Sequence, residues 1–170
     1  MYTMQEKLKF KEDIMKCIHV CGAITGKYMK LLCPDDEFIF ELMKAEKIRR
    51  IPVEVVRSDK SKYKMYIFEA VSRLKPTKFP NQNEDNARVI ALSNKHFIDN
   101  QNVTWLGLED VTSFAASSCV SGKLVPAMMY YKDSQLYAVY FSKKAFSLSE
   151  KDKDAVSNKL NVDNVIEYLF

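Results

Sequence analysis

A polar stretch near the middle of the chain constrains its organisation most. Residues 75–87 contain two prolines and many amide and acid side chains, and almost none of them could join an apolar core. A length of 170 residues fits one medium domain or two small ones. We therefore predict an N-terminal subdomain at 1–75, a linker at 76–87 and a C-terminal subdomain at 88–170.

The composition favours an ordinary globular protein, with 47% hydrophobic and 28% charged residues. Only four glycines occur, which counts against glycine-rich phosphate loops. No apolar run approaches the roughly 20 residues of a membrane span, and the charged first 30 residues do not resemble a signal peptide. We expect a cytoplasmic protein with no membrane contact, in which the four cysteines stay reduced.

In the N-terminal half, apolar residues at three- and four-residue steps predict a helix from Gln5 to Cys21. Two apolar runs at 28–33 and 38–43 are separated by the polar turn 34–37 and favour a strand hairpin, although a helix over 37–49 is an alternative. A second hairpin is predicted from the β-branched and aromatic residues of 53–56 and 63–68.

In the C-terminal half, similar patterns predict two strands, a helix, a hairpin with a central second strand, and a short final helix. The hairpin is expected at 128–131 and 136–141, and Ser149 with Asp152 resembles a capping box that opens the last helix. The other elements are expected at 88–92, 103–106 and 108–118, and an apolar tail at 165–170 is expected to dock. The fold class is α+β, with small antiparallel sheets each packed against amphipathic helices.

Short similar strings leave open a duplication that would give two similar subdomains. Glu12-Asp13-Ile14 parallels Glu109-Asp110-Val111, and Gly26-Lys27 parallels Gly122-Lys123. Matches this short also arise by chance. A true repeat would imply two similar binding faces.

No motif predicts a reactive centre. The segment from Gly22 to Lys27 is one residue too short for a phosphate-binding loop. Cys17 and Cys21 share a helix face from which His19 points away, and Cys119 with His96 has no local support as a nucleophile and base. We therefore expect no catalytic residues, no metal, no cofactor and no enzymatic activity.

Positive charge is concentrated in the first half of the chain. Residues 1–75 contain 16 Lys/Arg and 11 Asp/Glu, whereas residues 76–170 contain 10 and 11. Lysines and arginines could neutralise phosphates while tyrosines stack on bases, although strand alternation would equally place the lysines in water. The candidate nucleic-acid contacts are Lys47, Arg49, Arg50, Lys62 and Lys64.

Residues 103–115 and 128–141 combine a strand, a helix that begins Leu-Glu-Asp-Val, and a tyrosine-rich hairpin. In this order they resemble the C-terminal domain of MecA-type adaptor proteins, and 51–56 followed by 65–68 is similar to the end of that family's N-terminal domain. The resemblance implies an adaptor without catalytic residues. One domain would capture a substrate protein, and the other would deliver it to a Clp-type unfoldase.

We therefore predict a non-catalytic protein-binding adaptor or regulatory protein that acts through sheet-edge and helix-face contacts. The candidate partner-binding residues are Tyr130, Tyr131, Tyr137 and Tyr140 on the hairpin predicted at 128–131 and 136–141. Core packing is the competing interpretation for each tyrosine. The alternative function is a nucleic-acid-binding regulator that uses the basic N-terminal half.

Overall fold

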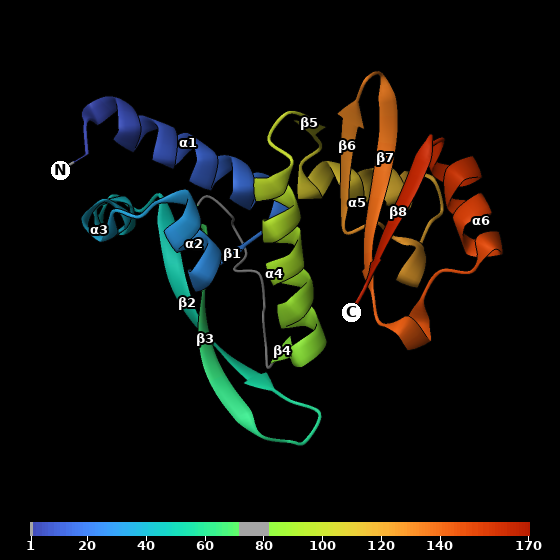
Figure 1. The fold of residues 1–170 in the computed structure, drawn as a ribbon, viewed down its shortest axis with the longest axis horizontal. Coiled ribbons are helices and arrows are strands. Elements are labelled where there is room, and N and C mark those ends of the chain that lie inside the picture. The colour runs from blue at the N-terminus through green and yellow to red at the C-terminus, as the bar shows by residue number, and fades with distance from the viewer. Residues whose placement is uncertain (1, 72–81) are drawn as a thin grey trace. The chain divides into compact units, whose positions relative to one another are not determined.

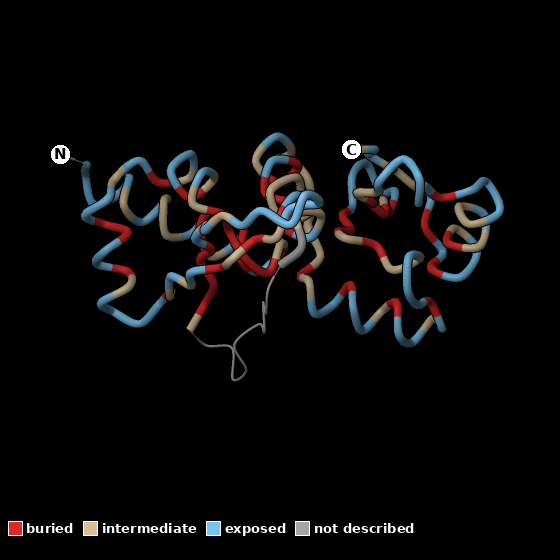
Figure 2. Tube along the Cα trace, turned by 90° about the horizontal axis from the view of Figure 1, so that it is seen from below, coloured by how far each residue is buried: buried red, intermediate tan, exposed pale blue. Residues whose placement is uncertain are grey.

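The computed structural model describes residues 2–71 and 82–170, which form two compact units, Met1–Asp99 and Asn100–Phe170 (Figure 1). Each unit combines helices with a small sheet, so the α+β class is confirmed. Residues that are buried recur along the elements of both units (Figure 2). Within the described residues, every helix is too short or too polar to cross a bilayer.

In its described residues, 2–71 and 82–99, unit 1 contains four helices and a four-stranded sheet in the order β1-β3-β2-β4. Strands β2 and β3 form an antiparallel hairpin, β1 pairs antiparallel with β3, and β4 pairs parallel with β2. The predicted first helix and the predicted hairpin of 53–56 and 63–68 are confirmed. The elements are α1 (Met4–Cys21), β1 (Ile24–Thr25), α2 (Gly26–Leu32), α3 (Asp36–Lys44), β2 (Ile48–Val56), β3 (Lys62–Ala70), β4 (Gln82–Asn83) and α4 (Glu84–Asp99).

The hairpin predicted at 28–33 and 38–43 is wrong, because these segments lie in α2 and α3. The helical alternative is right as far as Lys44. The Asp35 side chain accepts a hydrogen bond from the Phe38 backbone N–H at 3.1 Å and so caps α3. Because Phe38, Ile39 and Leu42 recur at helical spacing, one face of α3 can be buried.

The strand predicted at 88–92 and the domain start at residue 88 are also wrong. These residues belong to α4, whose buried side chains include Ala87, Asn94 and Phe97 at roughly helical steps. Helix α4 lies within unit 1, so the boundary between units falls after Asp99. Of the predicted linker, residues 84–87 are helical, and residues 76–81 lie outside the described part of the chain.

The fully buried Asn94 side chain fastens α4 to β1. Its Oδ1 accepts a hydrogen bond from the Thr25 backbone N–H at 2.9 Å, and its Nδ2 donates to the Ala23 carbonyl at 2.8 Å. Buried backbone groups need such partners, and β1 is too short to supply them all by strand pairing. The amide therefore fixes the segment from which α2 begins.

Unit 2 forms a sheet in the order β5-β6-β7-β8. Its elements are β5 (Thr104–Trp105), α5 (Leu108–Ser117), β6 (Met128–Lys132), β7 (Gln135–Ser142), α6 (Glu150–Leu160) and β8 (Asn164–Leu169). The predicted strand near 103–106, helix, hairpin and central position of β7 are confirmed. The expected docking of the tail takes the form of β8, which pairs parallel with β7.

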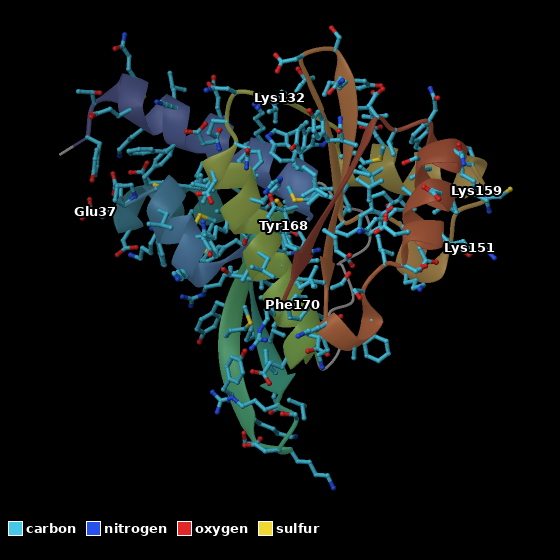
Figure 3. The ribbon with its side chains drawn as sticks, turned by 45° about the vertical axis from the view of Figure 1, so that its right-hand side comes forward. Glu37, Lys132, Lys151, Lys159, Tyr168 and Phe170 are labelled. Carbon is cyan, nitrogen blue, oxygen red and sulfur yellow. The ribbon has the colours of Figure 1, made fainter. Side chains whose placement is uncertain are left out.

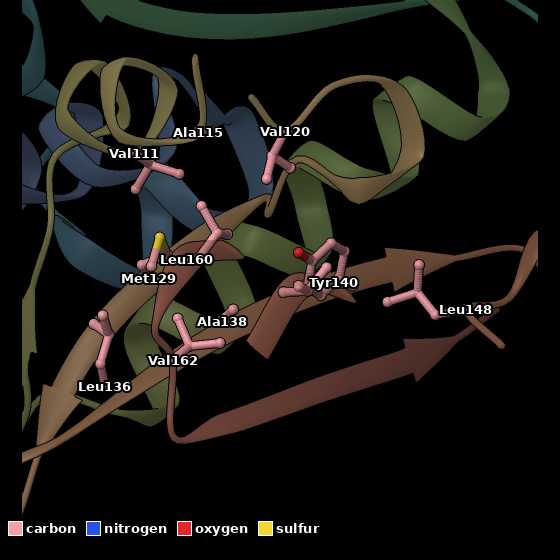
Figure 4. Close-up of a cluster of buried hydrophobic side chains, with 11 residues drawn as sticks. Val111, Ala115, Val120, Met129, Leu136, Ala138, Tyr140, Leu148, Leu160 and Val162 are labelled. Carbon is pink, nitrogen blue, oxygen red and sulfur yellow. The ribbon is translucent and has the colours of Figure 1, made fainter. Parts of the chain in front are cut away.

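The core of unit 2 lies between the two helices and one face of the sheet (Figure 4). Val111 of α5 and Leu160 of α6 are buried against Met129 and Ala138 of the sheet. The predicted capping box is confirmed, since Ser149 and Asp152 each bond the other's backbone N–H. Hydrogen bonds from Lys123 and Ser149 lower the pKa of Asp152 to about 2, so this cap stays ionised at neutral pH.

The two units differ in the path of the chain through the sheet. In unit 1 the first strand pairs with the second strand of the hairpin, whereas in unit 2 it pairs with the first. The matched strings also differ in structure, because Gly26-Lys27 opens α2 while Gly122-Lys123 lies in a short 3-10 turn. These differences do not support a duplication.

We expect Asn94→Ala to lower the free energy of unfolding of unit 1 by about 1–3 kcal/mol, because the Thr25 N–H and the Ala23 carbonyl would stay buried without this partner. Urea denaturation followed by circular dichroism measures the loss. Lys95→Ala, at the neighbouring exposed position of α4, is the control and should change stability by about 0.5 kcal/mol or less. Equal effects of the two substitutions would contradict the anchoring role of Asn94.

Candidate nucleic-acid interface

Helices α2 and α3 form a helix-turn-helix arrangement in unit 1. A three-residue connection, 33–35, joins them, and the β2–β3 hairpin follows α3 after 45–47. Met29 of α2 and the Cys33 side chain are buried, as are Phe38 and Leu42 of α3. The buried face of α2 packs on β3, α1 and α4, whereas that of α3 packs on β2. The ion pair between Lys30 and Asp36 joins the two helices.

The outer face of the β2–β3 hairpin is basic. Strand alternation places Arg50 of β2 on the same face as Lys62, Lys64 and Tyr66 of β3, and all four side chains are exposed. Residues 48–70 contain six Lys/Arg and three Asp/Glu, and Arg57 and Lys60 lie exposed at the turn. Figure 1 shows the hairpin extending away from α2 and α3. We call this outer face, with the turn, the basic hairpin surface.

Aromatic rings position several of these cations. The Arg50 guanidinium lies 4.6 Å from the centroid of the Tyr66 ring, and that of Arg57 lies 4.9 Å from the Tyr63 ring. Such contacts contribute about 0.5–1 kcal/mol at exposed sites. Both guanidinium groups are thus held over tyrosines before any ligand arrives.

Two acids lie in the basic hairpin surface. Glu54 bonds Lys62 at 2.8 Å, and this hydrogen bond lowers the pKa of Glu54. Asp59 at the turn accepts from the Ser61 backbone N–H at 2.9 Å. The surface keeps a net positive charge because its five cations outnumber the acids Glu54 and Asp59.

Arg49 is not a contact residue of this surface, which corrects the prediction. It is on the opposite face of the sheet, where its Nε donates to the fully buried Glu69 carboxylate at 2.5 Å. Of the other predicted contacts, Arg50, Lys62 and Lys64 share the basic hairpin surface, and Lys47 is exposed just before β2. Adjacent strand residues point to opposite faces, so Arg49 and Arg50 have different roles.

The exposed face of α3 carries the opposite charge. Asp36, Glu37 and Glu41 are exposed beside Phe40, which is 57% exposed, and Glu37 projects outward from α3 (Figure 3). Lys30 pairs with Asp36, and Lys7 pairs with Glu41 at 3.3 Å. This helix therefore exposes three carboxylates and one ring, with the Lys44 ammonium 5.4 Å from the centroid of the Phe40 ring.

The segment from Gly22 to Lys27 contains the cap that ends α1, the short strand β1 and the first two residues of α2. Gly22 ends α1 with a positive φ of 81°, a conformation that glycine adopts without strain, and its N–H bonds the Ile18 carbonyl. Thr25 then caps the start of α2 through its extended backbone. These residues form no loop that encloses a phosphate.

The cysteines and histidines do not assemble a reactive group. Hydrogen bonding to Cys21 and burial raise the pKa of Cys17, which keeps this thiol protonated. His96 is buried in α4 of unit 1, where desolvation lowers its pKa, and Cys119 is exposed in unit 2. Across 2–71 and 82–170, no group of three or more His, Cys, Asp or Glu side chains is arranged to hold a metal ion.

Two of the four predicted partner-binding tyrosines are buried in unit 2. Tyr130 is 4% exposed and stacks on Tyr137 at 4.9 Å. Tyr140 is 3% exposed, and its hydroxyl donates to the Leu124 carbonyl at 2.7 Å. The prediction is therefore wrong for Tyr130 and Tyr140 as exposed anchors, whereas Tyr131 is 47% exposed and Tyr137 is half-buried.

Three exposed apolar residues in the last part of unit 2 were not among the predicted contact residues. Phe146, Tyr168 and Leu169 are 70%, 42% and 53% exposed. Tyr168 is labelled in Figure 3. The tail was recognised only as apolar, because an edge strand and a buried strand have the same composition when they are short.

No family model matches the chain, and searches of curated proteins and of solved structures found no match either. The similarity to MecA-type adaptors stays a prediction. Conclusions about function therefore depend on the geometry of the two units.

Substitutions at the adjacent arginines should separate stability from ligand contact. We expect Arg49→Ala to lower the free energy of unfolding by about 2 kcal/mol, since the Glu69 carboxylate would remain buried without its cation. Arg50→Ala, on the exposed face, should change it by about 0.5 kcal/mol or less. Thermal and urea denaturation of both variants measure the difference, and a larger loss for Arg50→Ala would contradict the assignment.

Proposed function

We propose that unit 1 binds double-stranded DNA through its helix-turn-helix and the basic hairpin surface. The observation that carries this proposal is the short α2–turn–α3 pair followed directly by a hairpin with an exposed row of cations. A helix-turn-helix fits the width of the major groove, and a basic ribbon beside it can follow the phosphate backbone. Proteins that bind DNA in this way are positioned on the duplex by their contacts with the phosphates.

The spacing of the cations supports contact with a DNA strand. Lys62 and Lys64 lie two residues apart on one strand face, a separation of about 7 Å. Phosphate charges repeat about every 3.4 Å of helix axis along one DNA strand, so both ammonium groups can reach phosphates of the same strand. Arg50 continues this row of cations on strand β2, where it lies opposite Phe68 of β3.

The acidic face of α3 suits contacts with base edges rather than with phosphates. Carboxylates are repelled by phosphates, so α3 adds little to non-specific affinity. At base edges, however, Asp and Glu accept hydrogen bonds from the cytosine amino group, and an apolar ring contacts the thymine methyl group. In this proposal Glu37 and Phe40 contribute base preference, and the hairpin supplies the affinity.

We expect Lys62→Glu combined with Lys64→Glu to weaken binding of a fluorescent 20-base-pair duplex at least about tenfold at low salt, because two phosphate contacts are lost and two repulsions are gained. Fluorescence anisotropy at several salt concentrations measures this. The magnitude of the slope of log K against log salt should fall by about 1.8, which is 0.9 for each lost contact.

The matched control reverses the charge of two exposed lysines of unit 2, Lys132 and Lys151 (Figure 3). This variant has the same net charge as the hairpin variant but keeps the basic hairpin surface. Similar losses in the two variants would show only a general charge effect. If mixed duplexes give no anisotropy change with the unaltered chain at low salt, the DNA-binding proposal is wrong.

Protein binding by unit 2 is a second candidate function, and the edge of its sheet favours it. Among the described residues, β8 is one of the two edge strands of this sheet and pairs only with β7. Leu169 and Tyr168 are exposed on this strand, and an extended segment of a partner could add to such an edge. A Clp-type unfoldase, which the MecA resemblance implies, is one specific partner for this surface.

We expect Leu169→Lys to reduce recovery of such a partner, because the substitution places a charge in the middle of an apolar contact. Affinity purification from nuclease-treated extract, with quantitative mass spectrometry, compares the variant with the unaltered chain. Leu31→Lys changes an exposed leucine of unit 1 and is the control. Recovery of the same proteins in the same amounts by both variants would remove the proposed β8 contact.

A further inference from the structure

A hollow of about 570 Å³ lies within unit 1 where the start of α2, the outer part of β3 and the first turns of α4 approach one another. Its size falls within the range of sites for small ligands, which is about 300–1,000 Å³. The side chains that give it chemical character are Lys27 and Tyr28 of α2, Tyr63 and Tyr66 of β3, and Arg88 of α4.

The hollow exists because strand β1, beside β3, is short and the side chains of α4 that face β3 are small. Strand β1 pairs only with Ile67 and Phe68 of β3, so no described strand lies beside the rest of β3 on that edge. Helix α4 faces the hollow with Ala87 and Ala91, whose methyl groups leave space. This space is therefore built by the fold.

Aromatic rings and cations converge on the hollow. Three tyrosines line it, and a nucleobase can stack on the face of such a ring. The Lys27 ammonium is exposed at 5.6 Å from the Tyr28 ring centroid, where it can meet a phosphate. Arg88 pairs with Glu84 at 3.7 Å, an exposed ion pair that a phosphate can rearrange at small cost.

The hollow is continuous with the basic hairpin surface. Tyr66 belongs to both, since its ring lines the hollow and also carries the Arg50 guanidinium. A nucleic-acid strand that follows Lys62 and Lys64 would therefore reach the hollow within a few nucleotides. An apolar peptide side chain would contact the rings but would gain nothing from Lys27 or Arg88.

We propose that this hollow binds one unpaired nucleobase together with its phosphate. The inference rests on the proposed function, because it places the hollow beside a surface that binds duplex DNA. Two sources supply this chemistry: an unpaired nucleotide next to a duplex, or a free mononucleotide. In the first case the protein prefers duplexes with single-stranded ends, and in the second a nucleotide occupies the site by itself.

The test fills the hollow without changing charge. Ala91→Leu adds a branched side chain to its α4 wall, and Ala116→Leu, at an exposed position of α5, is the matched control. Anisotropy compares a blunt duplex with the same duplex carrying a five-nucleotide overhang. We expect the unaltered chain and the control to bind the overhang duplex about fivefold more tightly or better, and Ala91→Leu to lose this preference while its blunt-duplex affinity is unchanged.

A second variant covers the case in which Ala91→Leu does not fold. Tyr28→Leu keeps apolar bulk but removes one ring, and it should also reduce the overhang preference. Titration of the ¹⁵N-labelled chain with AMP, CMP, GMP or UMP up to about 5 mM distinguishes the second source. Changes in the amide chemical shifts of residues 25–28 and 87–91 that are absent in Ala91→Leu would identify a free nucleotide as the occupant.

The outcomes separate this inference from DNA binding itself. If the chain binds blunt duplexes but shows neither an overhang preference nor nucleotide-induced chemical-shift changes, the proposed nucleobase site is wrong. The proposed DNA binding would remain. Nucleotide-induced chemical-shift changes in a chain that binds no duplex would support the nucleobase site and contradict duplex DNA binding. Equal overhang preference in Ala91→Leu and the control would also overturn the assignment.

Discussion

The Asn94 amide is the interaction on which the geometry of unit 1 depends. Its two hydrogen bonds to Ala23 and Thr25 hold a two-residue strand that could not satisfy its own backbone groups. Helix α2 begins at the next residue and packs on β3, whereas α3 packs on β2. A polar side chain buried in α4 thus fixes where the helix-turn-helix starts relative to the sheet, and it also places α4 as a wall of the hollow.

Charged side chains of opposite sign lie on different surfaces of unit 1, because strand alternation and helix periodicity direct neighbouring residues to different faces. Arg49 neutralises the buried Glu69, whereas Arg50 reaches solvent one residue later. Helix α3 exposes carboxylates where the hairpin exposes cations. Net charge of the first half therefore says little about any one surface, because the +5 difference between 16 bases and 11 acids is spread over faces of opposite sign.

Elements with local signals were predictable, and elements with short apolar runs were not. The spacing of α1, the polar turn between β2 and β3, and the Ser149–Asp152 box each specify structure within a few residues. The runs at 28–33 and 88–92 have β-like composition, yet both are helical, since burial against neighbouring elements outweighs weak local preference. The candidate interface was anticipated at Arg50, Lys62 and Lys64, but Arg49 could be excluded only from its partner, which is 20 residues away.

By itself the sequence determined the α+β class, the two hairpins, the basic character of the first half and the absence of any recognised reactive motif. These properties follow from composition and from periodicities of 2 and 3.6 residues. Only the tertiary structure decided that α4 belongs to unit 1, that Tyr130 and Tyr140 are buried, and that Tyr28, Tyr63 and Arg88 line one hollow. Contacts between residues far apart in the chain depend on how whole elements pack, and no local pattern records that packing.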